Sequence, residues 1–320
     1  MSDYHGRLAA HLAAFVAFKQ SLGFEYHTEA AMLRQFDRWT QTQPDAGDTL
    51  TEALVQRWLT FSPQRGSKTR RRWEGLLRHL SLYLNTKGIP TYIPEPRAPS
   101  SHYTFIPHIY TAHELARIFT EADHVPPHRR STLPQVFPVL LRMLYGCGLR
   151  VSEATHLTLA DTDWEEHTLN IRHSKFGKDR RLPMSPSLTT ICQTYTEAVH
   201  PASPGTTFFF CHRDGSPISE DSVYRRFRDV LWLAGIPHRG NGQGPRVHDL
   251  RHSFAVHTLK AAVDRGVAME VVLPVLSAYL GHASLAATEQ YVRLTADAFP
   301  EIRDQLDRAT GWVIPEVAWE

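Results

Sequence analysis

Three short segments near the end of the chain carry side chains that suit chemistry on a phosphate group. His248 and Arg251 are three positions apart, which places both on one face of a helix. Leu280-Gly281-His282 follows, and then Tyr291. These side chains can bind an anion, move protons and attack phosphorus. Neither an acidic cluster nor a cysteine pair accompanies them, so the set favours phosphate chemistry over a metal site.

Further cationic groups lie far upstream. Arg150 follows an apolar helix and the turn Gly146-Cys147-Gly148, among neighbours that we expect to be buried. A buried arginine usually has an anionic partner. Glu153, in the same turn, is a candidate for the anionic partner of Arg150. Alternatively, it orients the Arg150 guanidinium toward another group. Lys175 and Lys178 lie near the tip of an expected hairpin, either as solvated turn lysines or as a lysine delivered to a phosphate.

Helical periodicity predicts the elements around these side chains. Thr111 and Glu114 form a capping box that opens one helix, and an apolar helix follows over residues 133–145. Another helix covers residues 269–279 and is expected to break or to begin near Pro274, because proline cannot donate a helical hydrogen bond.

Alternating residues between these helices predict a small sheet. Residues 168–173 and 180–184 alternate in β fashion around a turn at 174–178, which predicts a hairpin. With a short strand at 163–164, the hairpin would form a three-stranded sheet. The expected lysines would then lie at its tip.

The N-terminal region predicts a separate helical domain. Residues 1–95 contain four stretches with apolar residues at helical spacing, and their short connections favour a compact bundle. A segment rich in proline and serine follows, and we assign residues 96–110 to a linker. The remaining residues, 111–320, form the domain that carries the candidate chemistry.

Two basic runs are candidate contacts to a nucleic-acid backbone. One opens the last N-terminal helix beside Gly66-Ser67, where backbone N–H groups can meet a phosphate. The other lies on a helix capped by Ser219. For the first run, a solvated helix face is the alternative. The residues are Arg65, Lys68, Arg70, Arg71, Arg72, Arg225, Arg226 and Arg228.

Composition excludes several classes of protein. The 320 residues suit one large domain or two ordinary ones. The sequence has no apolar run long enough for a membrane span and no signal peptide at its start. Its three cysteines, Cys147, Cys192 and Cys211, are widely spaced, which fits a reducing cytoplasm. The net charge of +2 is too small to imply nucleic acid by itself.

Five segments in this order resemble the tyrosine recombinase family, the phage integrase superfamily. They are Gly148-Leu149-Arg150-Val151-Ser152-Glu153, the Lys175 hairpin, His248-Asp249-Leu250-Arg251-His252, Leu280-Gly281-His282 and Tyr291. The resemblance covers residues 111–300 strongly and the N-terminal bundle more loosely. It implies a mostly α fold with a small antiparallel sheet: a four-helix, SAM-like core-binding domain that binds DNA, followed by an α+β catalytic domain.

The resemblance also implies an activity. The protein would be a site-specific recombinase or integrase that cleaves and rejoins duplex DNA through a 3′-phosphotyrosyl intermediate, and so integrates, excises or resolves a mobile element. Tyr291 would be the nucleophile, and Arg150 and Arg251 would clamp the non-bridging oxygens. Lys175 would protonate the leaving 5′-oxygen, with Lys178 as the alternative.

The remaining roles follow from the same resemblance. His248 and His282 would supply hydrogen bonds and proton handling, and Glu153 and Asp249 would support the groups that touch the phosphate. A phosphotyrosyl link preserves the phosphodiester energy, so rejoining needs no ATP. The sequence shows no carboxylate metal site, and we therefore expect no cofactor and no metal.

The implied partner is a double-stranded DNA recombination site. The protein would act as a homo-oligomer, a tetramer in the synaptic complex and a dimer or monomer off DNA, with accessory recombination proteins as candidate partners. It would be a bacterial cytoplasmic protein, associated with the nucleoid when bound to DNA. Two alternatives stay open: a type IB topoisomerase-like enzyme, which the small N-terminal bundle disfavours, and a non-catalytic DNA-binding protein, which the complete residue set disfavours.

Two stretches extend beyond what the chemistry needs. The glycine-rich segment 238–246 and the stretch 260–276 are similar to those of integrases carried by transposons and integrative elements. The tail, residues 296–320, has much apolar side chain that should not be free in water. It would dock either on its own domain or on a neighbouring protomer.

Overall fold

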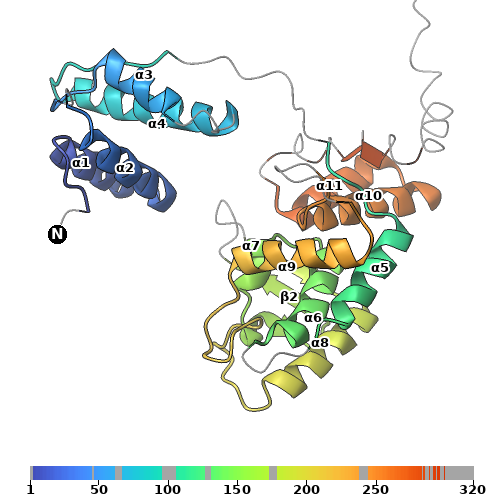
Figure 1. Ribbon diagram of the computed structural model, residues 1–320. Coiled ribbons are helices and arrows are strands. Elements are labelled where there is room, and N and C mark those ends of the chain that lie inside the picture. Colours follow the sequence, from blue (N-terminus) through green and yellow to red (C-terminus); the bar gives the residue numbers. More distant parts are fainter. Residues whose placement is uncertain are drawn as a thin grey trace, which may run out of the picture. The chain divides into compact units, whose positions relative to one another are not determined.

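The chain divides into two compact units, Met1–Thr104 and Phe105–Glu320 (Figure 1). The computed structural model describes residues 3–44, 47–61, 67–95, 106–126, 131–172, 179–237 and 244–282, with 284, 288, 291, 292, 294, 295 and 299. Among these residues, no helix is both long and apolar enough to cross a membrane.

The described part of the first unit is a bundle of four helices. They are α1 (Ala9–Ser21), α2 (His27–Thr40), α3 (Glu52–Thr60) and α4 (Ser67–Thr86). Thr51 caps α3, because its side chain accepts a hydrogen bond from the Leu54 N–H. Aromatic rings fill the centre, where Trp58 meets Trp73 edge-on at a centroid distance of 4.8 Å. Burial of such large rings holds the bundle together.

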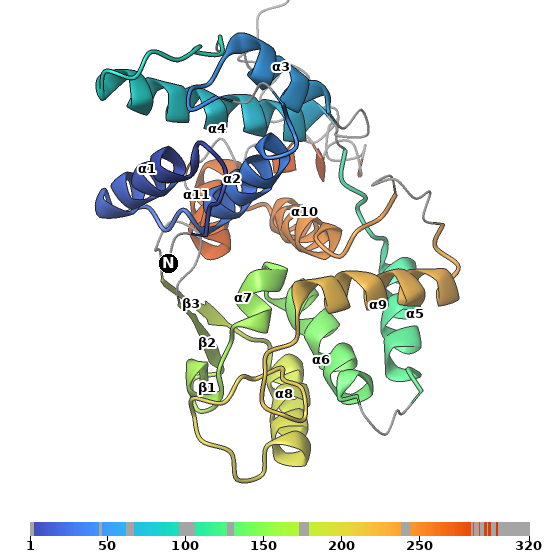
Figure 2. The ribbon, with the colours of Figure 1, turned by 60° about the vertical axis from the view of Figure 1, so that its left-hand side comes forward.

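The second unit combines helices with a small sheet. Its elements are α5 (Ala112–Asp123), α6 (Leu133–Gly146), α7 (Val151–Thr155), the 3₁₀ helix η1 (Leu159–Asp161), β1 (Thr162–Asp163), β2 (Thr168–Ile171), β3 (Arg180–Pro183), α8 (Pro186–Val199), α9 (Glu220–Leu233), α10 (Asp249–Asp264) and α11 (Met269–Leu280). The strands pair antiparallel in the order β1-β2-β3 (Figure 2). Ile171 pairs with Arg180, so the two strands face each other directly at the base of the hairpin.

Two apolar cores organise this unit. The larger joins α5, α6, α8 and α9 to the sheet, with Phe137, Phe209 and Phe227 almost completely buried. The smaller lies between α10 and α11 and includes Tyr291. Both views place α10 and α11 at the end of the unit opposite α8. The smaller core therefore holds the segments that carry the candidate chemistry.

The predicted fold class is confirmed: the protein is mostly α-helical with a three-stranded antiparallel sheet. The capping box at Thr111 and Glu114 is also present. The expectation for Pro274 is wrong, because α11 runs through it from Met269 to Leu280. Proline removes one helical hydrogen bond, and burial of Leu276 and Leu280 offsets that loss.

The segment that precedes α5 packs against the second unit. Residues 106–110, placed in the expected linker, belong to it. Tyr110 is completely buried in the larger core. Its backbone N–H donates to Ser253 Oγ at 2.8 Å, so this segment is tied to α10. A sequence pattern rich in proline could not reveal this long-range contact.

We expect a side chain at Gly148 to lower the free energy of unfolding. Gly148 has φ +57°, and a Cβ there would lie 2.5 Å from Phe254 Cδ1. Gly148→Ala should therefore cost about 1 kcal/mol for the left-handed backbone and about 2 kcal/mol more for overpacking. Gly266 is a matched control, with φ +73° and open space around the added Cβ. Equal losses in urea unfolding for both variants would contradict the steric argument.

Candidate active site

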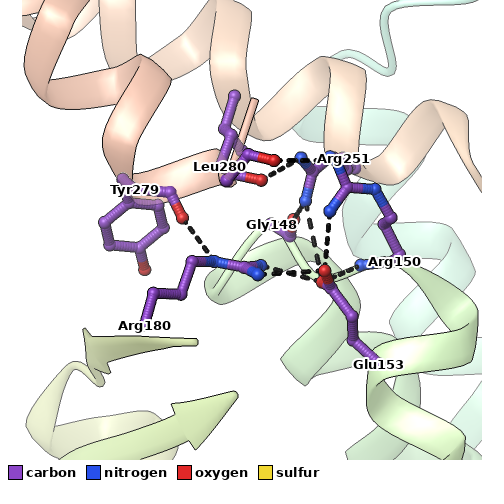
Figure 3. A network of polar contacts seen from close by, with 8 residues as sticks. Gly148, Arg150, Glu153, Arg180, Arg251, Tyr279 and Leu280 are labelled. Carbon is purple, nitrogen blue, oxygen red and sulfur yellow. Dashed lines mark hydrogen bonds and ion pairs between the residues drawn. The ribbon is translucent and has the colours of Figure 1, made fainter. Parts of the chain in front are cut away.

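One carboxylate organises the cationic side chains of the second unit (Figure 3). Glu153 lies in α7 with its side chain 4% exposed. Arg150, at the N-cap of α7, donates from Nη1 to Glu153 Oε1 at 2.7 Å and from its backbone N–H to Oε2 at 2.9 Å. Arg150 Nη2 also donates to the Gly281 carbonyl at 3.3 Å. The carboxylate thus holds Arg150 at the start of one helix and against the end of another.

Arg251 lies on α10 and is 2% exposed. Its Nη1 donates to the Gly148 carbonyl at 2.7 Å, and its Nη2 donates to the Leu280 carbonyl at 2.5 Å. Nη1 is also 3.8 Å from Glu153 Oε2. These bonds fix the plane of the guanidinium between the turn after α6 and the end of α11. The two predicted clamp arginines are thus brought to one centre.

Arg180, the first residue of β3, also binds Glu153. Its Nη1 and Nη2 donate to the two carboxylate oxygens at 3.0 and 2.8 Å. Its Nε donates to the Tyr279 carbonyl at 2.8 Å. Bidentate pairs of this kind are strong and directional. Arg180 therefore anchors the base of the β2–β3 hairpin to α7 and to α11 (Figure 3).

The electrostatics follow from this packing. Burial acts to raise the pKa of Glu153, but the hydrogen bonds and charge of Arg180, with Arg150 and Arg251, outweigh it and lower the pKa to about 2. Burial and the Arg150 charge lower the pKa of Arg251 to about 10. At neutral pH the Glu153 carboxylate is therefore ionised, and Arg251 stays charged.

Tyr291 is enclosed by imidazole rings. It is 1% exposed, and its hydroxyl lies 3.1 Å from His252 Nδ1. The His282 ring lies over the tyrosine ring at 6.0 Å with an interplanar angle of 17°. Thr288 Oγ1 lies 2.7 Å from His282 Nδ1, which fixes that ring. The nucleophile that we predicted is therefore buried beside the arginine centre.

The start of α10 positions His248. This residue is the N-cap of the helix, and burial and the Arg251 charge lower its pKa to about 4. The neighbouring Asp249 is completely buried and accepts the Arg246 backbone N–H at 2.9 Å. Ser253 Oγ donates to the Asp249 carbonyl at 2.8 Å. Asp249 thus holds the chain that enters the helix.

The predicted DNA-binding arginines differ in exposure and in their partners. Arg225 and Arg228 are exposed on α9, whereas Arg226 pairs with Asp229. On α4, Arg70 is half-buried, Arg71 is exposed, and Arg72 Nη2 is 2.9 Å from Glu29 Oε1. The following lie outside the described residues or side chains: Arg65, Lys68, Lys175, Lys178 and most of the segments 238–246 and 296–320. Within the described part of the chain, no group of three acidic, histidine or cysteine side chains could hold a metal ion.

Sequence reasoning missed two residues of the centre. Arg180 is two positions from Leu182, a buried residue of the same strand, so strand alternation places it on the inward face. His252 is four positions after His248 and therefore on the same helical face. The sequence thus contained the strand alternation at Arg180 and the helical spacing at His252. Each pattern also fits an ordinary solvated or core residue.

Comparison with protein families decides the family. Residues 109–297, more than half of the chain, match the model of the phage integrase family. The chain belongs to this family. A Sinorhizobium fredii protein, y4rB, whose name includes the words integrase/recombinase, is 29% identical over 92% of this chain and 95% of its own. The tyrosine recombinase XerA of Pyrococcus furiosus is 32% identical over 53% of this chain and 54% of its own.

Solved structures share the fold of this integrase-family chain. The integrase of the transposon Tn1549, in complex with circular intermediate DNA, has a TM-score of 0.64 and 15% identity, covering 93% of this chain and 99% of that one. The XerH site-specific recombinase bound to its difH substrate has a TM-score of 0.61 and 18% identity, covering 89% of this chain and 79% of that one. These likenesses concern the fold alone.

The Glu153 network predicts a stability change. Glu153→Gln removes the charge that compensates the buried arginines and should lower the free energy of unfolding by about 3 kcal/mol at neutral pH. Because the pKa of Glu153 is lowered from 4.5 to about 2, its stabilising contribution is present above pH 4.5 and is lost as pH falls toward 2. The difference between wild type and variant should shrink over that range.

Urea unfolding measured across this pH range tests the prediction. Glu165→Gln is the control, because Glu165 is exposed in the turn between β1 and β2. A loss for Glu153→Gln no larger than that of the control would contradict the proposed role of the carboxylate.

Proposed function

We propose that this integrase-family protein is a site-specific DNA recombinase that cleaves and rejoins duplex DNA through a 3′-phosphotyrosyl intermediate. One observation carries the proposal: Arg150, Arg251 and Tyr291, from distant parts of the sequence, lie around one buried centre with neutral imidazoles beside them. Such a centre suits an anion that gains charge in the transition state.

The attack on phosphorus can be followed from the side chains. The Tyr291 oxygen forms a bond to the scissile phosphorus, and the bond to the 5′-oxygen breaks. Arg150 and Arg251 hold the non-bridging oxygens as their negative charge increases. The side chain of Arg150 is 19% exposed, so it can reach a phosphate that arrives from solvent. Hydrogen bonds to backbone carbonyls keep Arg251 oriented before DNA arrives.

The departing 5′-oxygen needs a proton. We assign this role to Lys175, with Lys178 as the alternative, both on the β2–β3 hairpin. The bonds from Arg180 to Glu153 fix the base of that hairpin beside the arginine centre. In the proposal, an ammonium group from the segment between β2 and β3 acts as general acid toward the leaving oxygen. His248 and His282 would donate hydrogen bonds to the phosphate.

DNA recognition would use both units. We infer that residues 1–95 form the core-binding domain, with Arg70 and Arg71 on α4 toward the phosphate backbone. In the second unit, Arg228 and Arg246 line a cavity of about 320 Å³ that reaches His248. Arginines around a cavity beside the centre suit a phosphate that flanks the scissile one.

The proposed assembly rests on the family resemblance. We propose a tetramer that joins two duplex sites and integrates, excises or resolves a mobile element. The Tn1549 integrase and XerH, whose structures contain DNA, support a recombination site as the partner. The apolar tail would tie cleavage to assembly by docking either in cis or on a neighbouring protomer, with accessory recombination proteins as further candidate partners.

A nicked suicide duplex tests the proposed chemistry. A duplex selected from a random library by its binding to the protein would be nicked beside the cleavage position, so that the released fragment diffuses away. Wild type should accumulate as a covalent protein–DNA complex in a denaturing gel, without added metal or ATP. Tyr291→Phe keeps the ring but lacks the nucleophilic oxygen, and should bind the duplex without forming the complex.

Tyr279→Phe is the control, because Tyr279 is a nearby tyrosine whose hydroxyl donates to the Pro183 carbonyl. It should form the covalent complex at a rate near that of wild type. Equal trapping by Tyr291→Phe would overturn the assignment of the nucleophile, and no trapping by wild type would overturn the proposed function.

A further inference from the structure

The hydroxyl of Tyr291 contacts a histidine that the assigned roles leave unused. His252 Nδ1 lies 3.1 Å from the hydroxyl oxygen, within hydrogen-bonding distance. Both residues are buried, His252 at 7% and Tyr291 at 1% exposure. Water is therefore largely excluded from the contact. A nucleophile that must lose a proton needs an acceptor at this distance.

The other two histidines are oriented differently. The His282 ring lies parallel over the tyrosine ring, and its Nδ1 faces Thr288 Oγ1 at 2.7 Å. The His248 ring meets the His252 ring edge-on at 4.9 Å. The geometry gives His252 the direct contact and leaves the other two for phosphate oxygens.

The surroundings keep His252 neutral. Burial lowers its pKa to about 3, and the nearby His248, Arg246, Arg251 and His282 act in the same direction. Above that pKa the ring is uncharged and has one nitrogen with a lone pair. An arriving phosphate would offset the charge of Arg251 and so raise the basicity of His252 when substrate is present.

We propose that His252 is a further catalytic residue, which accepts the proton of the Tyr291 hydroxyl through Nδ1. The proposal rests on the proposed function. As the phenolic O–H bond breaks, the proton moves to Nδ1, and the oxygen's electron pair forms the bond to phosphorus. The bond to the 5′-oxygen then breaks, and that oxygen takes a proton from the hairpin lysine. Rejoining reverses each transfer, so no proton is gained or lost overall.

The size of the effect follows from the chemistry of phenols. A free phenol has a pKa near 10, so only about one molecule in a thousand is ionised at neutral pH. A positioned base typically accelerates such a step by about 10² to 10⁴. Removal of the base should therefore slow cleavage by at least about 100-fold without weakening DNA binding.

The decisive variant is His252→Asn. The asparagine amide oxygen can occupy the position of Nδ1 and accept the tyrosine hydrogen bond, but it cannot take the proton. A role limited to positioning would survive this change, whereas the proton-accepting role would not. We expect the rate of covalent-complex formation on the suicide duplex to fall by at least about 100-fold, with duplex affinity unchanged in a gel-shift assay.

His257→Asn is the matched control. His257 lies on the same helix, and its Nδ1 contacts the Tyr145 hydroxyl at 2.9 Å, so the variant alters an equivalent histidine–tyrosine pair away from the phosphate site. It should cleave at the wild-type rate. If wild type and the control cleave and His252→Asn cleaves equally fast, the proposal is overturned while the proposed function stands.

A second measurement leaves His252 intact and so does not depend on the variant's folding. Difluorotyrosine in place of Tyr291 has a more acidic phenol. If His252 accepts the proton, the cleavage rate falls in acid as His252 becomes protonated, and the midpoint of that fall stays in place when the phenol changes. If the phenol ionises to solvent, the midpoint moves to lower pH with fluorination. The second outcome would overturn the proposal.

Discussion

The active centre depends on a single carboxylate placed among three guanidinium groups. Without Glu153, the positive charges of Arg150, Arg180 and Arg251 would repel one another in a poorly hydrated interior. The Glu153 carboxylate holds the start of α7, strand β3 and helix α10 together, because each contributes one of these arginines (Figure 3). The ion pair between Arg180 and Glu153 therefore sets the position of β3 and of the sheet to which it belongs.

In the proposed function, the surplus of positive charge is what the centre offers to DNA. Three arginines share one carboxylate, and the histidines beside them are neutral because burial and the arginine charges lower their pKa values. A phosphate that enters meets preoriented donors, which need little rearrangement as charge develops in the transition state.

The sequence predicted the elements better than their contacts. Helical spacing placed His248 and Arg251 on one face, and strand alternation with the turn residues predicted the three-stranded sheet. Periodicity reports which side of an element is apolar, but it does not report which distant group a polar side chain meets. Arg180 was therefore read as a strand residue only. Pro274 was misjudged because tertiary burial outweighs a local helix-breaking preference.

The central claim is that Glu153 and the arginines stabilise one another, and a double-mutant cycle measures this directly. Urea unfolding would be compared for wild type, Glu153→Gln, Arg180→Gln and the double variant. Because each single change breaks the same ion pair and leaves a buried charge with fewer compensating partners, the double variant should be more stable than the sum of the single losses predicts, with a coupling free energy of about 2 kcal/mol or more. Additive losses would show that the pair is not the organising interaction and would contradict the account.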